Sequence, residues 1–513
     1  ISVDSDIGSA TASTTNMFTL VLFVCLLQVI NTRNIDTYSL RRSLLLQTEL
    51  DTQVGSDLPL NTEEVVANEI LMDLKRREID ESFRSNEFSY SKHYFAYRDE
   101  IKRSKVYDII RAMPKGGALH VHSSLMLSAD RLVALTYEDH LYACFAADDL
   151  QLQFSYDVPL RPCERKWRLL DDVRRASGNV TRFDSDLQKY FTLNVDENTD
   201  YDINFIWERF EKVTSTISSL INYRPAREKF FYEGLTQFYN DNVMYVEIRS
   251  GLSYLYELNG TVHDRVYLAH LYHRVAEQFK EDHPDFIGVK LIVSKRRSIT
   301  IEEAKGVIDL AKRLRIELPQ FLAGFDLVGQ EDLGKPLKDF QPLLDEVKED
   351  IDFYFHGGET NWHGTASDEN LIDAILLGSK RIGHGFALIK HPTLMKTVRE
   401  NDIAIEVNVI SNLVLSLLCD IRNHPLATYL ALGMPVVLSS DDPGVWGADP
   451  LSYDYYLTFV AVASRHADLR MLKQLVLNSV KYSALDDTQK EIMYKQLQIK
   501  WDEFIRDVVK RHN

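Results

Sequence analysis

Two histidines at alternate positions, His120 and His122, lie in the apolar stretch GALHVHS that begins at Gly117. In a strand, residues two apart point to the same face, so both imidazoles would be directed at one site. Such a pair on its own is more often two hydrogen-bonded polar residues than a pair of metal ligands. Its meaning therefore depends on what other side chains the fold brings to that face.

Further histidines and carboxylates follow three later apolar runs. His356 lies in DFYFHGG and Glu359 comes three residues later, His384 lies in RIGHG, and PVVLSS leads into the pair Asp441-Asp442. Each group alone is weak support for a site, but their shared position after apolar runs is poorly explained by coincidence. Three imidazoles and one carboxylate are a donor set typical of zinc. The predicted ligands of one Zn²⁺ ion per chain are His120, His122, His356 and Asp441.

A zinc ion held in this way would supply hydrolytic chemistry. Zinc lowers the pKa of a bound water toward about 7 and so provides a hydroxide nucleophile at neutral pH. Glu359 would then transfer protons, and His384 would orient the hydroxide or stabilise developing charge. The pattern predicts hydrolysis at an electrophilic carbon.

Eight short apolar runs must carry these residues, and helix-like stretches separate most of them. In chain order the runs cover residues 118–122, 243–249, 286–293, 321–328, 352–358, 381–385, 403–410 and 435–440. Near-continuous apolar strands alternating with helices are typical of a parallel sheet covered on both faces. Eight such units predict an α/β fold, a (β/α)8 barrel of the TIM type, in which functional groups gather at the carboxyl ends of the strands. A doubly wound open sheet is the alternative, but no glycine-rich dinucleotide or phosphate loop follows the first run.

The rest of the chain surrounds this repeat. The run MFTLVLFVCLLQVI is too short to span a bilayer and is typical of a secretory signal. A charged helical segment follows, in which Asn61 and Glu64 have capping-box spacing. The predicted parts are upstream or precursor residues 1–16, a signal peptide over 17–32, an N-terminal helical arm over 33–112, and the barrel over 113–513 with an insertion over about 137–194.

Cysteines and glycosylation motifs agree with export. Cys144 and Cys163 lie in the predicted insertion and could close one disulfide in an oxidising compartment. Cys419 follows LVLSLL and is expected to be a buried free thiol. Asn179 and Asn259 begin N-x-T acceptor sequences for N-glycosylation. These features predict a secreted, extracellular protein with no membrane span.

The composition is ordinary for a globular protein of 513 residues, with 45% hydrophobic and 26% charged residues. The formal net charge of −17 argues against a nucleic-acid partner, which would require a basic surface. It says nothing about small uncharged ligands.

The strings around the predicted site resemble a known family. MPKGGALHVH, FHGGETNWHG, RIGHGFAL and LSSDDPGVWGA are similar to the motifs of adenosine deaminases, in the version carried by the secreted adenosine deaminase growth factors. NEILMDLK, FYNDNVMYVEIR and AGFDLVGQED also fit, and the resemblance covers nearly everything from about residue 45 to the C-terminus. It implies hydrolysis of adenosine, and of 2′-deoxyadenosine, to inosine and ammonia by attack of zinc-bound hydroxide on purine C6. It also implies a homodimer built through the N-terminal arm.

The resemblance assigns further roles residue by residue. Glu359 would protonate purine N1, and His384 would hold and deprotonate the water. Asp441 would bind zinc and accept a hydrogen bond from the hydroxide, while Asp442 would contact purine N7.

Three more positions would form the nucleoside pocket. The backbone of Gly329 matches a glycine that contacts purine N3. Trp207 matches an aromatic lining the pocket, although a role as a core anchor is an equally open alternative. Where the family commonly has an aspartate that contacts the sugar, this chain has Ser123. Zinc ligation should survive this change, whereas sugar affinity and specificity should differ.

A growth factor that binds a cell-surface receptor or glycan, with the barrel only as a scaffold, is the alternative function. The intact set of predicted zinc and proton-transfer residues argues against it, and the two functions are compatible if depletion of extracellular adenosine is the signal. Among related enzymes, an AMP deaminase must hold a phosphate, and no basic loop of that kind is apparent in the sequence.

Overall fold

The computed structural model describes residues 37–146, 149–193 and 202–512. The chain divides into two compact units, residues 1–52 and 53–513. The described part of the first unit contains helix α2 (Thr37–Asp51), which has no buried residue. The predicted precursor and signal segments, 1–16 and 17–32, lie outside the described residues. None of the described helices combines the length and apolar character needed to cross a membrane.

The second unit contains eight parallel strands in two four-stranded sheets. The first sheet has the order β1 (Gly116–His122), β5 (Val243–Ser250), β8 (Gly288–Arg296) and β9 (Leu322–Val328). The second has the order β10 (His356–Gly357), β11 (Arg381–His384), β12 (Ala404–Val407) and β13 (Val436–Leu438). Single parallel bridges link the edges of the two sheets, Val121 with Asp441 and Phe325 with Phe353. The predicted α/β fold with eight parallel strands is confirmed.

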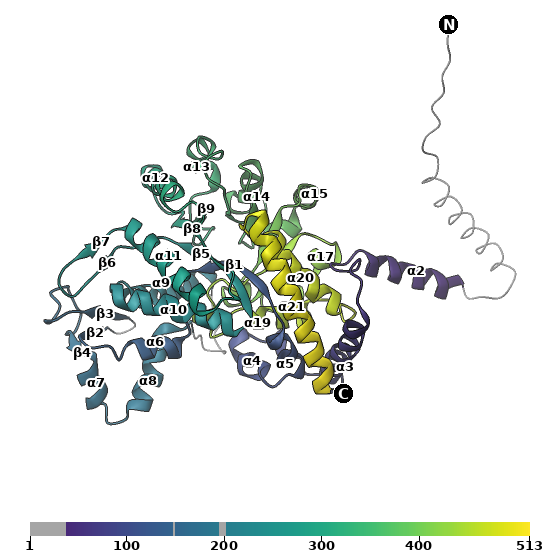
Figure 1. Cartoon of the computed structure of the whole chain (residues 1–513), viewed down its shortest axis with the longest axis horizontal. Coiled ribbons are helices and arrows are strands. Elements are labelled where there is room, and N and C mark those ends of the chain that lie inside the picture. The colour runs from purple at the N-terminus through teal and green to yellow at the C-terminus, as the bar shows by residue number, and fades with distance from the viewer. Residues whose placement is uncertain (1–36, 147–148, 194–201, 513) are drawn as a thin grey trace, which may run out of the picture. The chain divides into compact units, whose positions relative to one another are not determined.

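Helices alternate with the strands and pack against them, as Figure 1 shows. Capping boxes begin two of them: Thr300 and Glu303 at α12, and Thr365 and Asp368 at α14. The helices between and after the strands are α10 (Arg224–Asn240), α11 (Arg265–Asp282), α12 (Ile301–Glu317), α13 (Leu337–Asp345), α14 (Ala366–Leu376), α15 (Pro392–Glu400), α16 (Val409–Val414), α17 (Leu426–Ala431), α18 (Pro443–Trp446), α19 (Ser452–Leu457) and α20 (Leu469–Lys481).

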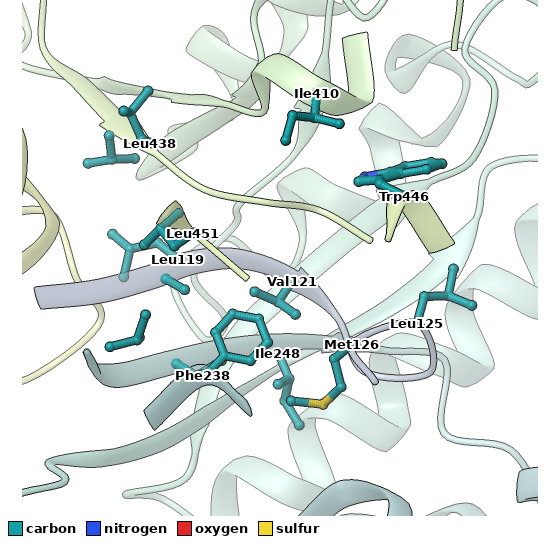
Figure 2. Packing of buried hydrophobic residues seen from close by; sticks show 14 of the residues in the cluster. Leu119, Val121, Leu125, Met126, Phe238, Ile248, Ile410, Leu438, Trp446 and Leu451 are labelled. Carbon is teal, nitrogen blue, oxygen red and sulfur yellow. The ribbon is translucent and has the colours of Figure 1, made fainter. Parts of the chain in front are cut away.

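The strands are apolar because both of their faces are covered. Every residue of β5, β11, β12 and β13 is buried, which matches the near-continuous apolar runs in the sequence. Figure 2 shows Leu119 and Val121 of β1 among the side chains of Ile248 on β5 and Leu438 on β13. This packing fixes the strands whose ends carry the predicted site.

Helices from both ends of the chain pack together in the second unit. These are α3 (Thr62–Ser85), α4 (Tyr94–Ile101), α5 (Lys105–Ala112) and the C-terminal α21 (Asp487–His512), and α3 contacts both α20 and α21. The capping box of Asn61 and Glu64 is present, and buried Glu64 also accepts hydrogen bonds from Lys473 and Trp501. The predicted arm from residue 53 onward is therefore part of the main unit, and dimerisation through it stays a prediction.

A segment with a separate small sheet follows β1 and α6 (Ala129–Leu135). It contains β2 (Leu141–Phe145), β3 (Leu150–Phe154), β4 (Arg168–Leu169), α7 (Leu170–Ala176) and α8 (Val180–Gln188), with the antiparallel order β3-β2-β4. The predicted disulfide Cys144–Cys163 is present. The chain then returns to the strand repeat through α9 (Ile203–Ile221), and β6 (Leu255–Tyr256) pairs with β7 (Val262–His263) before α11.

Cys419 differs from its prediction. It is a free thiol, as expected, but it is exposed rather than buried. Helix α16 ends at Val414, and the chain bends after it, so the apolar pattern of LVLSLL does not continue to the cysteine.

Candidate active site

Four imidazoles and a carboxylate converge at the carboxyl ends of the strands. His120 and His122 lie among the last three residues of β1, His356 lies on β10, and His384 is the last residue of β11. The ring centroid of His120 is 4.5 Å from that of His356, 4.9 Å from that of His384 and 5.6 Å from that of His122. Asp441 follows the end of β13 after Ser439 and Ser440, and its backbone N–H donates to the carbonyl of His120 at 3.0 Å. The topology thus gathers side chains that are up to about 320 residues apart in the sequence.

Two overlapping groups have ligand atoms within 4.8 Å of one another. One consists of His120, His356, His384 and Asp441, and the other of His122, Asp441 and Asp442. The predicted zinc ligands are divided between these groups, with Asp441 in both, and His122 Nε2 lies 3.1 Å from Asp441 Oδ1. The structure therefore brings the four predicted ligands together and adds His384 to the cluster.

The donor atoms at the centre of this cluster fit a metal ion. His120 Nε2, His384 Nε2 and Asp441 Oδ1 are buried and make no hydrogen bond. A buried polar atom without a partner costs about 1–3 kcal/mol, so three of them in one place indicate a ligand-binding site rather than a packing role. Imidazole nitrogens and a carboxylate oxygen are the atoms that zinc prefers among protein ligands.

The other ring nitrogen of two histidines is held by a buried carboxylate. His120 Nδ1 lies 2.6 Å from Glu406 Oε2, and His356 Nδ1 lies 2.7 Å from Asp326 Oδ2. A carboxylate on Nδ1 fixes the orientation of the ring and leaves Nε2 for the metal. Sequence reasoning missed Glu406 and Asp326. The available signal was an acidic residue inside an otherwise apolar strand.

Buried guanidinium groups balance these carboxylates. Arg249 donates to Asp326 at 2.8 Å and to Glu406 at 2.6 Å, and Arg381 donates to Glu406 at 2.6 Å. Burial by itself would raise the pKa of Glu406, but Arg249 and Arg381 outweigh it and hold that pKa well below its usual range. Glu406 is therefore a carboxylate in the folded protein at any physiological pH.

Glu359 has the opposite electrostatic character. Burial, followed by the nearby charges of Asp441 and Glu331, raises the pKa of Glu359 well above its usual range. Glu331 accepts the backbone N–H of Glu359 at 2.8 Å and so fixes the backbone of this residue. The raised pKa favours the neutral acid form of Glu359, which can donate a proton or a hydrogen bond.

His384 stays neutral beside this acid. Burial lowers the pKa of His384 well below its usual range. Its Nδ1 lies 3.3 Å from Glu359 Oε1 and 3.2 Å from the side-chain amide of Asn412. His384 and Asp441 also have backbone φ angles of 61° and 57°, a left-handed conformation that non-glycine residues adopt at a cost. The fold maintains this strain at both site residues, which favours a functional requirement for their orientation.

A cavity of about 480 Å³ opens onto these groups. The predicted substrate contacts all line it: Ser123, Trp207, Gly329 and Asp442, together with His122, His356, Glu359, His384 and Asp441. Trp207 is 9% exposed and packs edge-on against Phe210, with 5.5 Å between the two ring centroids. Its ring therefore belongs to the core and also reaches the cavity. The volume lies within the range of small-molecule sites, roughly 300–1,000 Å³.

Comparisons with known proteins show the family of this chain. Residues 184–500 match the family model described as adenosine deaminase, and residues 18–110 match that of the adenosine/AMP deaminase N-terminal region. The chain is 44% identical over 479 residues to adenosine deaminase 2 from Homo sapiens, covering 91% of this chain and 93% of the human protein. It is 41% identical over 468 residues to an adenosine deaminase from Phlebotomus duboscqi, covering 90% of each.

A solved structure of lower identity shares the fold. An amidohydrolase from Burkhoderia ambifaria, solved with bound Zn, aligns with a TM-score of 0.54 and 19% identity, covering 79% of this chain and 94% of that chain. Likeness at this identity concerns the fold alone.

Proposed function

The chain belongs to the adenosine deaminase family, as its motifs predicted, and from that premise we propose that it is a hydrolase with one zinc ion per chain. It converts adenosine to inosine and 2′-deoxyadenosine to 2′-deoxyinosine, and each reaction releases ammonia. The observation that carries the proposal is the position of buried Glu359, whose pKa burial raises well above its usual range, in the same cavity as the cluster of imidazoles and Asp441. Hydrolytic deamination needs both an acid for the purine ring and a site that activates water.

Zinc would be held by His120, His122, His356 and Asp441. Bound there, zinc supplies Lewis acidity and a lowered pKa for water. Glu406 and Asp326 keep His120 and His356 oriented through their Nδ1 atoms.

The residues of this chain would move the protons. Glu359 donates its proton to purine N1, which makes C6 more electrophilic. His384, kept neutral by burial, accepts a proton from the attacking water and delivers it to the departing amine. The remaining proton of the new C6 hydroxyl returns to Glu359 as the carbonyl forms. Water and adenosine are thereby converted to inosine and ammonia with Glu359 and His384 restored.

The cavity would orient the nucleoside around C6. Asp442, whose pKa burial and Asp441 raise well above its usual range, can donate a hydrogen bond to purine N7. Gly329 presents its backbone to N3, and Trp207 provides an aromatic wall. Ser123 lies where the sugar contact is expected, and as a neutral hydroxyl it would hold the sugar less strongly than a carboxylate.

The proposal extends to the setting of the enzyme. We place it outside the cell, after removal of a signal peptide over 17–32, as a glycoprotein that can act as a growth factor by depleting extracellular adenosine. Both acceptor asparagines, Asn179 and Asn259, are exposed, which supports their modification. Homodimerisation through the helices of residues 33–112 is the corresponding assembly proposal: light scattering of the full chain should give the mass of two chains, and the mass of one chain would contradict it.

Conversion of adenosine to inosine, followed by the change in ultraviolet absorbance, tests the activity directly. Wild-type protein should turn over adenosine, and Glu359→Gln should lower kcat by about 10²–10⁴-fold because glutamine cannot transfer a proton. Glu349→Gln, an exposed acid far from the cavity lining, is the matched control. Full turnover by Glu359→Gln would overturn the mechanism. Stimulation of cells by the inactive variant at wild-type strength would instead favour a receptor-binding growth factor with a scaffold barrel.

A further inference from the structure

Several basic residues also line this cavity. They come from separate elements: Arg227 from α10, Arg265 from α11, and Lys295 and Arg296 from the end of β8. No single basic loop is visible in the sequence because these residues are spread over about 70 positions. The fold brings them to the wall of one cavity.

Arg227 is a buried cation without a carboxylate. Its guanidinium donates only to neutral groups, namely the carbonyl of Ile221 at 2.8 Å, Tyr272 Oη at 3.1 Å, Asn222 Oδ1 at 3.1 Å and Ser253 Oγ at 3.3 Å. The other buried arginines of the described residues each pair with a carboxylate: Arg174 with Asp184, Arg249 with Asp326, Arg297 with Glu331 and Arg381 with Glu406. A buried charge without a counter-charge is costly, so Arg227 at a cavity wall indicates an anionic ligand.

A short hydrogen-bond chain leads from Arg227 to the expected sugar contact. Arg227 donates to Tyr272, and the Tyr272 hydroxyl donates to Ser123 Oγ at 3.3 Å. Ser123 is neutral and so does not balance Arg227, and Glu211, which also lines the cavity, forms its ion pair with Arg296.

Lys295 and Arg265 strengthen the positive character of the same wall. Neither has a carboxylate within 4 Å among the described residues, whereas Arg296 forms an ion pair with Glu211. Burial, followed by the charges of Arg265 and Arg296, lowers the pKa of Lys295. Glu303 acts in the opposite direction and only partly offsets this effect.

The position of these cations matches the sugar side of a bound purine. In the proposed mode, C6 and N1 face Glu359 and N3 faces Gly329. Ring atom N9, which carries the sugar, lies beside N3. The site of a Cβ on Gly329 would be 3.7 Å from Arg296 Cγ, and Lys295 and Arg296 pair in register with the last two residues of β9. The sugar would therefore point toward the basic wall.

We infer that the cavity admits an adenine nucleotide, an adenine nucleoside whose sugar carries a phosphate group, with Arg227 and Lys295 facing the phosphate. The inference rests on the proposed function and names a further substrate class for the same site. A phosphate monoester carries a charge of about −1.5 to −2 at neutral pH and three acceptor oxygens, which suits guanidinium and ammonium groups. No new chemistry is required, because water still displaces the C6 amine as ammonia.

Steady-state assays with adenosine, 5′-AMP and 3′-AMP on the purified, metal-loaded protein test this inference. At low ionic strength, kcat/KM for at least one monophosphate should reach about one tenth or more of that for adenosine, and it should fall as salt screens the contact. The two isomers show which sugar position carries the recognised phosphate. Turnover of adenosine with both monophosphates below that ratio would overturn the inference and leave the proposed function standing. Turnover of none of the three would count against the proposed function itself.

Variants assign the effect to the basic wall. In Lys295→Gln, and in Arg227→Met if it folds, the ratio of kcat/KM for the preferred monophosphate to that for adenosine should fall about tenfold, as expected for loss of one charge-assisted contact. Lys305→Gln removes an exposed charge from α12 outside the cavity lining and should leave the ratio unchanged. An equal ratio in Lys295→Gln and Lys305→Gln would contradict the assignment.

Discussion

Replacing Glu406 by glutamine should weaken both the fold and metal binding, because this one carboxylate serves three charged or polar partners. Its Oε2 lies 2.6 Å from His120 Nδ1 and 2.6 Å from Arg249 Nη2, and its Oε1 lies 2.6 Å from Arg381 Nε. Glutamine keeps one acceptor oxygen but places an NH₂ group where the second carboxylate oxygen accepts hydrogen bonds, so at least one donor of the three partners loses its acceptor. Breaking a buried ion pair from one side costs about 3–5 kcal/mol, and loss of a carboxylate behind a metal-binding histidine lowers metal affinity about 10–100-fold.

The effect should also depend on pH in a defined direction. The pKa of Glu406 in the folded protein lies well below its usual range, where burial is outweighed by Arg249 and Arg381. Its contribution to stability is therefore fully present above the unfolded-state pKa of about 4.3 and is lost as the pH falls below it. The difference in unfolding free energy between wild type and Glu406→Gln should shrink on acidification.

Urea unfolding and zinc titration of the two proteins measure these quantities. Glu406→Asp retains the charge and should recover part of the stability, while Glu349→Gln removes an exposed acid and should change neither measurement. If Glu406→Gln unfolded at the wild-type urea concentration and bound zinc with wild-type affinity, the assigned role of this carboxylate would be refuted.

Three further outcomes follow from other parts of the structure. Because burial raises the pKa of Glu359 well above its usual range, kcat should fall as the pH rises through that raised value, and a profile with no alkaline loss attributable to this acid would count against its role as proton donor. Replacing Cys144 and Cys163 together by serine should lower the unfolding free energy by about 3 kcal/mol in denaturant titrations, and equal stability of the reduced and oxidised wild type would contradict this. Gly444→Ala places a Cβ 2.2 Å from the backbone oxygen of Leu127 and should lower the unfolding free energy by about 1–3 kcal/mol. Gly306→Ala, which has open space in α12, should raise the unfolding free energy by about 0.4–1 kcal/mol in the same denaturant titrations.

The strand positions could be predicted from the sequence because buried parallel strands leave a local signal. The runs 243–249 and 381–385 correspond closely to β5 (Val243–Ser250) and β11 (Arg381–His384). The run 352–358 predicts a longer strand than the structure contains. Strand β10 has two residues, since only His356 and Gly357 pair in the ladder with β11. The apolar pattern marks where a strand is buried and does not mark how many of its residues form ladder hydrogen bonds.

The side chains of the candidate site could be predicted from the sequence for a similar reason. His120, His356, His384 and Asp441 end or follow apolar runs, and the carboxyl ends of parallel strands meet at one side of the sheet. The structure shows their convergence, while the choice of four zinc ligands and the catalytic roles stay predictions.

The buried charge network could not be found in the same way. Arg249 contacts Asp326 77 residues away and Glu406 157 residues away, so no short stretch of sequence contains a charge with its partner. The basic wall of the cavity was missed for the same reason, because Arg227 and Lys295 come from different elements. Cys419 shows the converse error, in which an apolar run was extended past the end of its helix.

Metal content measured together with activity on one sample tests the central claim most directly. Protein stripped with a chelator should lose adenosine turnover, and stepwise addition of zinc should restore it in proportion to bound metal, reaching full activity at one ion per chain. Full turnover by protein that elemental analysis finds free of transition metals would contradict the account.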